Sequence, residues 1–130
     1  MRMTRASQYA VAALVHMTRG DGRKFASHDI ARAAGLPELF LLKVLKPLAS
    51  AGILYSSRGP GGGYSLAKPA KDVTLLAVIE AVDGPVRAKP AADHDGKLGQ
   101  QLHDLCDRAA HTYRRALARV TLAELVNGAK

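Results

Sequence analysis

The stretch SSRGPGGGYSL, from Ser56 to Leu66, places one arginine beside four glycines and a proline. Glycine lets a backbone turn sharply and approach a phosphate or another chain closely, because it carries no side chain. Two phosphate-binding patterns are excluded: the third glycine of a G-x-G-x-x-G fingerprint would fall at Tyr64, and no G-K-S/T run follows. The pattern favours a slim β-hairpin with Gly61–Gly63 supplying positive φ angles, and with Arg58 able to enter a narrow minor groove of DNA. A plain hairpin with a solvated arginine is the alternative.

Two lysines precede this stretch on a predicted helix. Lys43 and Lys46 are three residues apart and therefore share one helical face. Such a pair can contact phosphates or base edges in a major groove. Two solvated lysines on an exposed face are the alternative.

A third group combines residue types that bind metals. His103, Cys106 and Asp107 are spaced for one face of a helix, with His111 nearby. The simpler interpretation makes Cys106 a small buried hydrophobic residue, and a redox-active thiol is a further alternative. We expect no metal site and keep Cys106 as a candidate redox thiol. No Ser-His-Asp order, paired carboxylates or H-E-x-x-H motif is present, so the sequence does not predict an enzyme.

The elements around the glycine stretch follow a recognisable order. Apolar spacing predicts a helix over 6–18, and Ser27 is expected to cap a short helix that ends at Gly35. A third helix follows Pro37, with a buried stripe and with a kink or early end at Pro47. The stripe comprises Leu41, Val44, Leu45 and Leu48. A tight turn between two short helices, followed by a hairpin, predicts a winged helix-turn-helix, a mainly α fold with a small β-hairpin.

The remaining residues predict a helix over 74–82, an irregular linker over 83–97 and one long helix from Leu98 onward. The long helix carries an apolar seam that a small domain cannot bury by itself, so pairing with a second copy is expected. The seam comprises Leu98, Leu102, Leu105, Ala109, Tyr113, Ala116 and Val120. We predict a DNA-binding domain over 1–83 and a linker with a dimerisation helix over 84–130.

Composition and charge agree with a nucleic-acid partner. The chain has 130 residues, a formal net charge of +8 and one cysteine, which excludes an internal disulfide and agrees with a reducing compartment. Residues 1–70 carry ten Lys/Arg against three Asp/Glu, whereas residues 71–130 carry nine against eight. A basic N-terminal half predicts a polyanion-binding surface, although scattered lysines on a basic protein are the alternative. No apolar run is long enough to cross a membrane, and we expect a cytoplasmic protein.

Several segments together resemble the Rrf2 family of bacterial transcription regulators, which includes iron–sulfur cluster and nitric-oxide sensors. The similar segments, nearly end to end, are QYAVAALVHM, IARAAGLPELFLLKVLKPLASAGIL with its unusual Pro47, SSRGPGGGYSLAKP, VTLLAVIEAVDGP and VTLAEL. The resemblance implies a homodimer whose long C-terminal helices cross. It also implies that each protomer sets its third helix in a major groove and its wing in the adjacent minor groove of a near-palindromic DNA site.

The chain departs from this family at two places. Leu42 and Lys43 stand at positions where the iron–sulfur cluster regulator of this family has polar base-reading residues. A leucine cannot form a hydrogen bond with a base and can only touch a thymine methyl. Cluster-binding members carry three cysteines in the segment that corresponds to 86–102, which has none here, although His103 matches a histidine ligand. We therefore expect no typical iron–sulfur cluster and no other cofactor.

The sequence thus predicts a sequence-specific DNA-binding transcription regulator, a repressor, that acts as a homodimer on double-stranded DNA. The expected DNA contacts come from the helix-turn-helix and the wing. They comprise Ser27, His28, Leu42, Lys43, Lys46, Ser57, Arg58, Gly59, Pro60 and Gly61. A nucleic-acid-binding dimer of low specificity and a protein-interaction module are the alternatives. The effector stays open.

Overall fold

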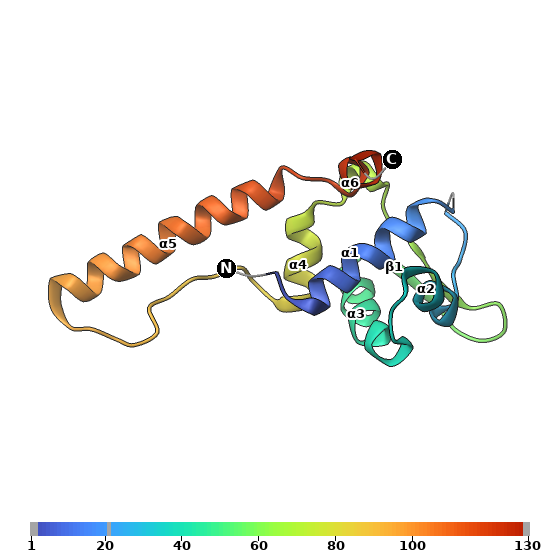
Figure 1. Cartoon of the computed structure of the whole chain (residues 1–130), viewed down its shortest axis with the longest axis horizontal. Coiled ribbons are helices and arrows are strands. Elements are labelled where there is room, and N and C mark those ends of the chain that lie inside the picture. Colours follow the sequence, from blue (N-terminus) through green and yellow to red (C-terminus); the bar gives the residue numbers. More distant parts are fainter. Residues whose placement is uncertain (1–2, 21, 129–130) are drawn as a thin grey trace.

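The structure is a computed structural model that describes residues 3–20 and 22–128. Met1, Arg2, Asp21, Ala129 and Lys130 lie outside the described residues, so the outer ends of both predicted domains are not described. The elements follow one another along the chain (Figure 1). They are α1 (Arg5–Thr18), α2 (Ser27–Ala34), α3 (Glu38–Ser50), β1 (Leu54–Ser57), β2 (Gly63–Leu66), the 3₁₀ turn η1 (Ala70–Asp72), α4 (Leu75–Asp83), α5 (Gly96–Ala118) and α6 (Leu122–Gly128).

Helices α1 to α4 and α6 surround one hydrophobic core, to which the hairpin contributes from one side. The predicted stripe of α3 is confirmed, because all four of its residues are buried. Helix α3 continues through Pro47 to Ser50, so the proline does not end the helix. The predicted winged helix-turn-helix fold is confirmed. No helix among the described residues is both long and apolar enough to cross a membrane.

Asp83, the last residue of α4, joins the end of this helix to the start of α1. Its Oδ2 atom accepts hydrogen bonds from the Thr4 and Ser7 hydroxyls, both at 2.6 Å. Thr4 also caps α1 by accepting the Ser7 backbone N–H at 3.1 Å. Ser7 is fully buried, so its hydroxyl depends on this carboxylate for a hydrogen-bond partner.

Replacing Asp83 by alanine is expected to lower the free energy of unfolding by about 1–3 kcal/mol, because it leaves the buried Ser7 hydroxyl without its acceptor. Urea unfolding followed by circular dichroism measures the change. Asp93→Ala, which removes an exposed carboxylate from the linker, is the control and should change stability by less than about 0.5 kcal/mol. Equal stability of the two variants would contradict this role of Asp83.

The hairpin is fixed to the segment that enters α2. Strands β1 and β2 are antiparallel, with Leu54 opposite Leu66 and Ser57 opposite Gly63. Phe25 pairs with Tyr64 through two backbone hydrogen bonds of 2.8 Å each. The wing therefore has a fixed position relative to the helix-turn-helix.

Two predictions about the helices are wrong. Ser27 does not cap α2: Ala26 is the N-cap residue, and Ser27 is the first residue of the helix, where its hydroxyl lies 3.4 Å from Glu38 Oε1. One helix does not continue to the end of the chain either, because α5 ends at Ala118 and α6 begins at Leu122. Backbone hydrogen bonds from Leu75 N–H to the Val120 carbonyl and from Leu122 N–H to the Val73 carbonyl, both 2.8 Å, hold this break against the start of α4.

As a result, Val120 lies beyond α5 and not on its apolar seam. Thr121 accepts the Glu124 backbone N–H at 3.3 Å and so caps α6. The sequence T-L-A-E has the form of a capping box and was the available signal for this second helix. Helix α6 returns to pack against α1 and η1. The division of the chain into domains at residue 83 stays a prediction.

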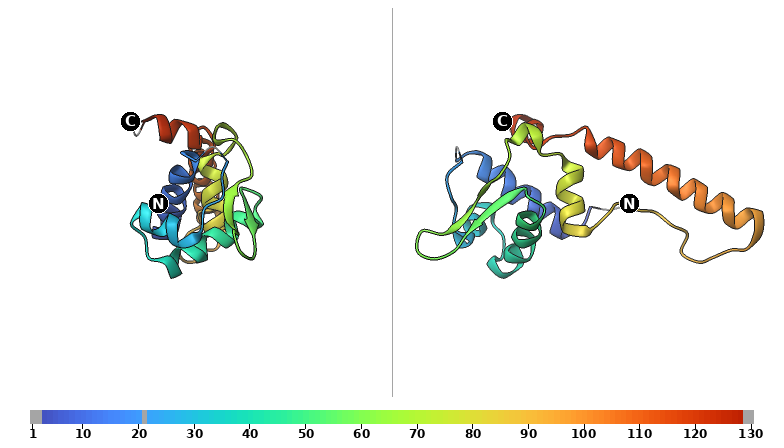
Figure 2. Two further views of the ribbon diagram at one scale, coloured as in Figure 1. Left: turned by 90° about the vertical axis from the view of Figure 1, so that its right-hand side faces the viewer. Right: turned by 180° about the vertical axis from the view of Figure 1, so that it is seen from behind.

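The wing and α5 extend from opposite ends of the molecule (Figures 1 and 2). The linker between α4 and α5 runs beside α5 without helix or strand, as predicted. The wing, which is predicted to contact DNA, and the helix that is predicted to pair with a second copy are therefore well separated.

Candidate nucleic-acid interface

The turn between α2 and α3 sets the angle of the second helix. Gly35 adopts a left-handed conformation with φ 70°, as predicted, and the Leu36 N–H donates to the Ala31 carbonyl at 2.8 Å. Pro37 then precedes the first residue of α3. This arrangement is a helix-turn-helix with α3 in the place of the recognition helix.

The outer surface of α3 carries both lysines. Leu39, Lys43, Lys46 and Ser50 are exposed at intervals of three and four residues, so they form one outward stripe. Lys43 Nζ lies 5.8 Å from the centre of the Phe40 ring, which Tyr9 of α1 contacts edge-on. Leu42, in contrast, is half-buried beside the stripe.

The wing tip is built from glycines for two different reasons. Gly61 has φ 75°, a conformation that other residues adopt at a cost. Gly62 has no such angle, so that part of the prediction is wrong; a Cβ atom there would lie 2.5 Å from the Ser57 carbonyl oxygen. Glycine at this position permits close backbone packing, and the loop stays narrow.

A groove joins α3 to the wing. It measures about 550 Å³ and is lined mainly by polar and cationic side chains. Its residues are Lys46, Ala49 and Ser50 of α3, with Ser56, Ser57, Arg58 and Tyr64 of the hairpin. The predicted residues Lys46, Ser57 and Arg58 are thus brought together in one hollow with two cations.

The other predicted contacts do not line this groove. Gly59, Pro60 and Gly61 form the exposed wing tip beyond Arg58. Ser27 and His28 lie at the start of α2, where the exposed His28 is 3.3 Å from Asp29. Their roles in DNA contact stay predictions.

Sequence reasoning missed three candidate residues. Leu39 is 81% exposed at the first turn of α3, and Ser50 and Ser56 line the groove. The spacing of Leu39 from Lys43 and Lys46 was the signal for the first. Ser50 and Ser56 follow only from the position of the hairpin against α3.

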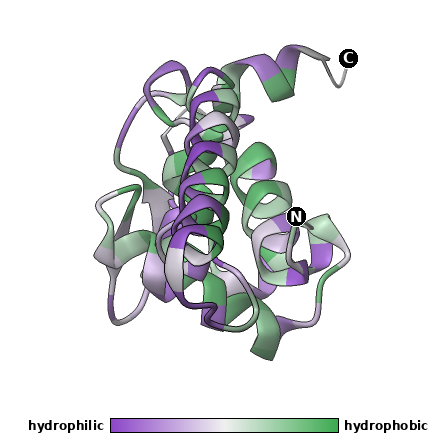
Figure 3. Ribbon diagram, turned by 90° about the vertical axis from the view of Figure 1, so that its left-hand side faces the viewer, coloured by the Kyte–Doolittle hydropathy of each residue, from purple (hydrophilic) through white to green (hydrophobic). Residues whose placement is uncertain are grey.

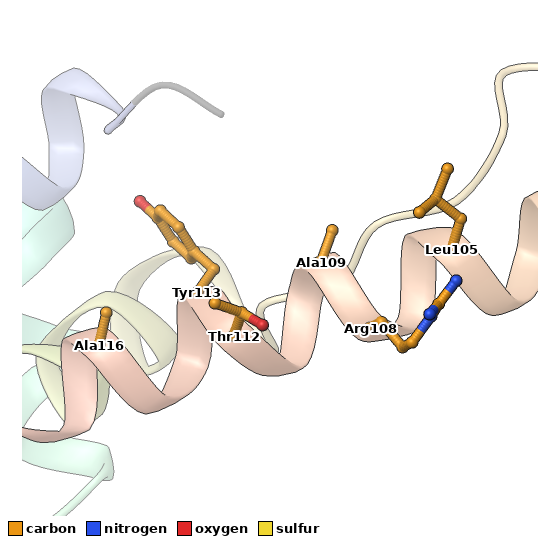
Figure 4. Close-up of a pocket in the computed structure, with 6 residues that line it drawn as sticks. All are labelled: Leu105, Arg108, Ala109, Thr112, Tyr113 and Ala116. Carbon is orange, nitrogen blue, oxygen red and sulfur yellow. The ribbon is translucent and has the colours of Figure 1, made fainter.

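The apolar seam lies on α5, away from this surface. Leu98 and Leu105 are 50% and 55% exposed, and Ala109 and Ala116 are exposed as well. Figure 3, viewed from the end where α5 begins, shows hydrophobic residues among the hydrophilic ones along this helix. Leu105, Ala109 and Tyr113 project from the same side of α5 (Figure 4) and help to line a shallow hollow of about 560 Å³.

Comparison with known proteins decides the family. The profile of the Rrf2 family, described as an iron-dependent transcriptional regulator, matches residues 3–128. The chain belongs to the Rrf2 family. One Rrf2 relative, the transcriptional regulator IscR of Yersinia enterocolitica, is 38% identical over an alignment of 137 positions that covers 98% of this chain and 80% of the relative.

Solved structures agree on the Rrf2 fold. IscR of T. potens has a TM-score of 0.75 at 23% identity, covering all of this chain and 89% of the other. CymR, the global cysteine regulator of B. subtilis, has a TM-score of 0.77 at 23% identity, covering 98% and 97%. The chain is therefore a DNA-binding transcription regulator with a winged-helix fold, and the proteins it resembles are regulators and not enzymes.

The donor groups do not fit an iron–sulfur cluster. Cys106 is the single cysteine of the chain and is half-buried on α5. His103 lines a pocket that Cys106 does not line. Within residues 3–20 and 22–128, no three His, Cys, Asp or Glu side chains are grouped closely enough to hold a metal ion. A cluster of the usual kind needs three or four protein ligands, which this segment does not provide.

Proposed function

We propose that the protein is a sequence-specific repressor that binds a near-palindromic DNA site as a homodimer. Helix α3 lies in a major groove, and the wing enters the adjacent minor groove. The proposal rests on the groove of the protein between α3 and the wing. This groove places Lys46 and Arg58 on one polar surface, which can contact a major groove and the adjacent minor groove of DNA.

The homodimer follows from α5. Its exposed apolar side would be covered by the same side of a second copy, and a twofold dimer contacts two equivalent half-sites. Because the dimer would have twofold symmetry, an inverted repeat is the expected site, with half-sites about 34–36 Å apart along one face of the DNA. Repression is the expected effect, since a dimer covering both half-sites blocks the access of polymerase to a promoter.

The signal that controls binding does not involve a typical cluster. Cys106 stays a candidate redox thiol. If a Cys106→Ser variant responds to every oxidant in the same way as the unchanged protein, that role is excluded.

Arg58→Ala is expected to weaken binding to the specific site by about 1–3 kcal/mol, which is about 5- to 150-fold. It should also reduce the slope of the logarithm of the binding constant against the logarithm of the salt concentration by about one, which corresponds to one phosphate contact. The reason is that Arg58 is exposed at the wing and is the cation nearest its tip. Fluorescence anisotropy with specific and random duplexes measures the affinity, and circular dichroism checks that the helix content is unchanged.

Lys97→Ala is the matched control, because it removes one charge at the start of α5, far from the wing (Figure 1). It should leave specific binding within about twofold. Unchanged affinity of Arg58→Ala with intact helicity would contradict the minor-groove role. Equal affinity for specific and random duplexes would favour a binder of low specificity, and absence of salt-dependent DNA binding would favour a protein-interaction module.

A further inference from the structure

A further pocket, here called the linker pocket, lies between the linker and α5. It measures about 430 Å³, which is within the usual range for a site that binds a small molecule. The linker forms one wall with residues 86–89, and α5 forms the other. The buried side chains of Val86 and Ala110 contribute apolar surface between the two walls.

The polar lining of this pocket is mostly basic. Arg87 and Lys89 come from the linker, and His103, His111 and Arg114 come from α5. Asp107 is the acidic residue among the lining residues. Arg87 and Lys89 therefore place two cations on the linker side of a small space, opposite the two histidines and Arg114 of α5, and an anion between the two walls would interact favourably with both linker cations.

In the part of the chain that the structure describes, neither linker cation has an acidic side chain within 4.0 Å. Across residues 3–20 and 22–128, the ion pairs within 4.0 Å are His28 with Asp29 and Arg114 with Glu80. Arg87 and Lys89 thus remain available to a ligand, whereas Arg114 is held by Glu80 at the inner end of the pocket.

The pocket is separate from the proposed dimer surface. With about 3.6 residues per turn, His103, Asp107, Ala110, His111 and Arg114 share one face of α5. The apolar seam around Leu105, Ala109 and Tyr113 falls on the opposite face. A second copy that covers the seam would consequently leave the linker pocket open.

The geometry points to a binding site for a small anion that carries carboxylate or phosphate groups. Arg87 and Lys89 on one side and the α5 side chains on the other would each bind one part of such a ligand through charge-assisted hydrogen bonds. The ligand would hold the linker against α5.

This position gives the site a route to the DNA-binding end, a step that rests on the proposed function. Glu80 of α4 contacts Arg114 and also accepts the Val86 N–H at 2.9 Å. The same carboxylate therefore joins α4, the start of the linker and α5. An anion bound next to Arg114 would stabilise one arrangement of this junction and so change the affinity for DNA.

Calorimetric titration of the full chain at constant ionic strength tests the site, with inorganic phosphate and citrate as probes. We expect saturable binding of at least one probe, and at least about tenfold weaker binding to the variant Arg87→Ala/Lys89→Ala. Binding of phosphate alone indicates a phosphorylated ligand, and binding of citrate alone indicates a carboxylate ligand. The control variant Lys97→Ala/Arg115→Ala removes two cations of α5 that line neither the hollow on its apolar side nor the linker pocket. It should bind the probes as the unchanged protein does.

Absence of saturable binding by both probes, or an equal loss in the two variants, would overturn the anion site. Operator binding measured with and without the bound probe tests the regulatory step. Bound anion with unchanged operator affinity would overturn that step and leave the site intact. Failure of the protein to bind any specific DNA, both with and without a probe, would instead contradict the proposed function, whatever the calorimetry shows.

Discussion

Leu105→Glu is expected to separate the proposed homodimer into monomers, with a dimer dissociation constant at least about a hundredfold higher. Leu105 is 55% exposed in the single chain and lies in the middle of the apolar side of α5. Burying a leucine contributes about 1.5–3 kcal/mol, and a twofold interface contains the residue twice. The substitution also places two unpaired carboxylates in the interface, which adds to the loss.

Sedimentation equilibrium measures the dissociation constant. Gln100→Glu is the matched control, because it adds the same charge at an exposed position of α5 that does not line the apolar hollow. It should remain dimeric. A Leu105→Glu protein that stays dimeric would contradict the assignment of this side of α5 to the second copy, and a monomeric unchanged protein would contradict the homodimer itself.

Gly63→Ala is expected to lower the free energy of unfolding by about 2–6 kcal/mol. Gly63 has φ 153°, and an added Cβ atom would lie 2.4 Å from the carbonyl oxygen of Phe25. That oxygen accepts the Tyr64 N–H at 2.8 Å, so the hairpin would have to move away from its partner segment. Loss of the two Phe25–Tyr64 hydrogen bonds at about 0.5–1.5 kcal/mol each, with about 1–3 kcal/mol of backbone strain, gives this range.

Gly61→Ala separates strain from collision. Gly61 also has positive φ, but no atom lies within 4 Å of a Cβ built there. The expected cost is about 1–2 kcal/mol, from the backbone conformation alone. Urea unfolding at one protein concentration compares the two variants, since a dimer's stability depends on concentration. A smaller loss for Gly63→Ala than for Gly61→Ala would contradict the fixed position of the wing.

The elements of the winged helix-turn-helix could be predicted because their signals are local. The stripe from Leu41 to Leu48 has helical spacing, Gly35 ends α2, and glycines separate two short strands. Each of these patterns is set by residues within one or two turns of the chain. The order of the elements then determined the fold class.

The largest error comes from contact between distant segments. The break after α5 depends on backbone pairing of Val120 and Leu122 with residues near Val73. The requirement for glycine at Gly62 arises from the Ser57 carbonyl across the turn. Neither contact leaves a periodic pattern in the sequence.

The residues of the candidate sites also fall into two groups, those that local sequence signals predict and those whose position depends on packing. Lys43, Lys46 and Arg58 could be named from residue type, spacing and order alone. The groove that joins Lys46 to Arg58 depends on how the hairpin packs on α3. The linker pocket could not be predicted, because Arg87 and Lys89 face α5 only through an irregular segment whose path no sequence pattern specifies.

Selection of genomic fragments tests the central claim, sequence-specific binding by a homodimer, most directly. The protein, prepared without oxygen, is mixed with sheared DNA from its own source, and the retained fragments are sequenced. Strong enrichment of an inverted repeat upstream of a few genes, with half-sites about one helical turn apart, is the predicted result. Fragments retained in the same proportions as in the input DNA would contradict it.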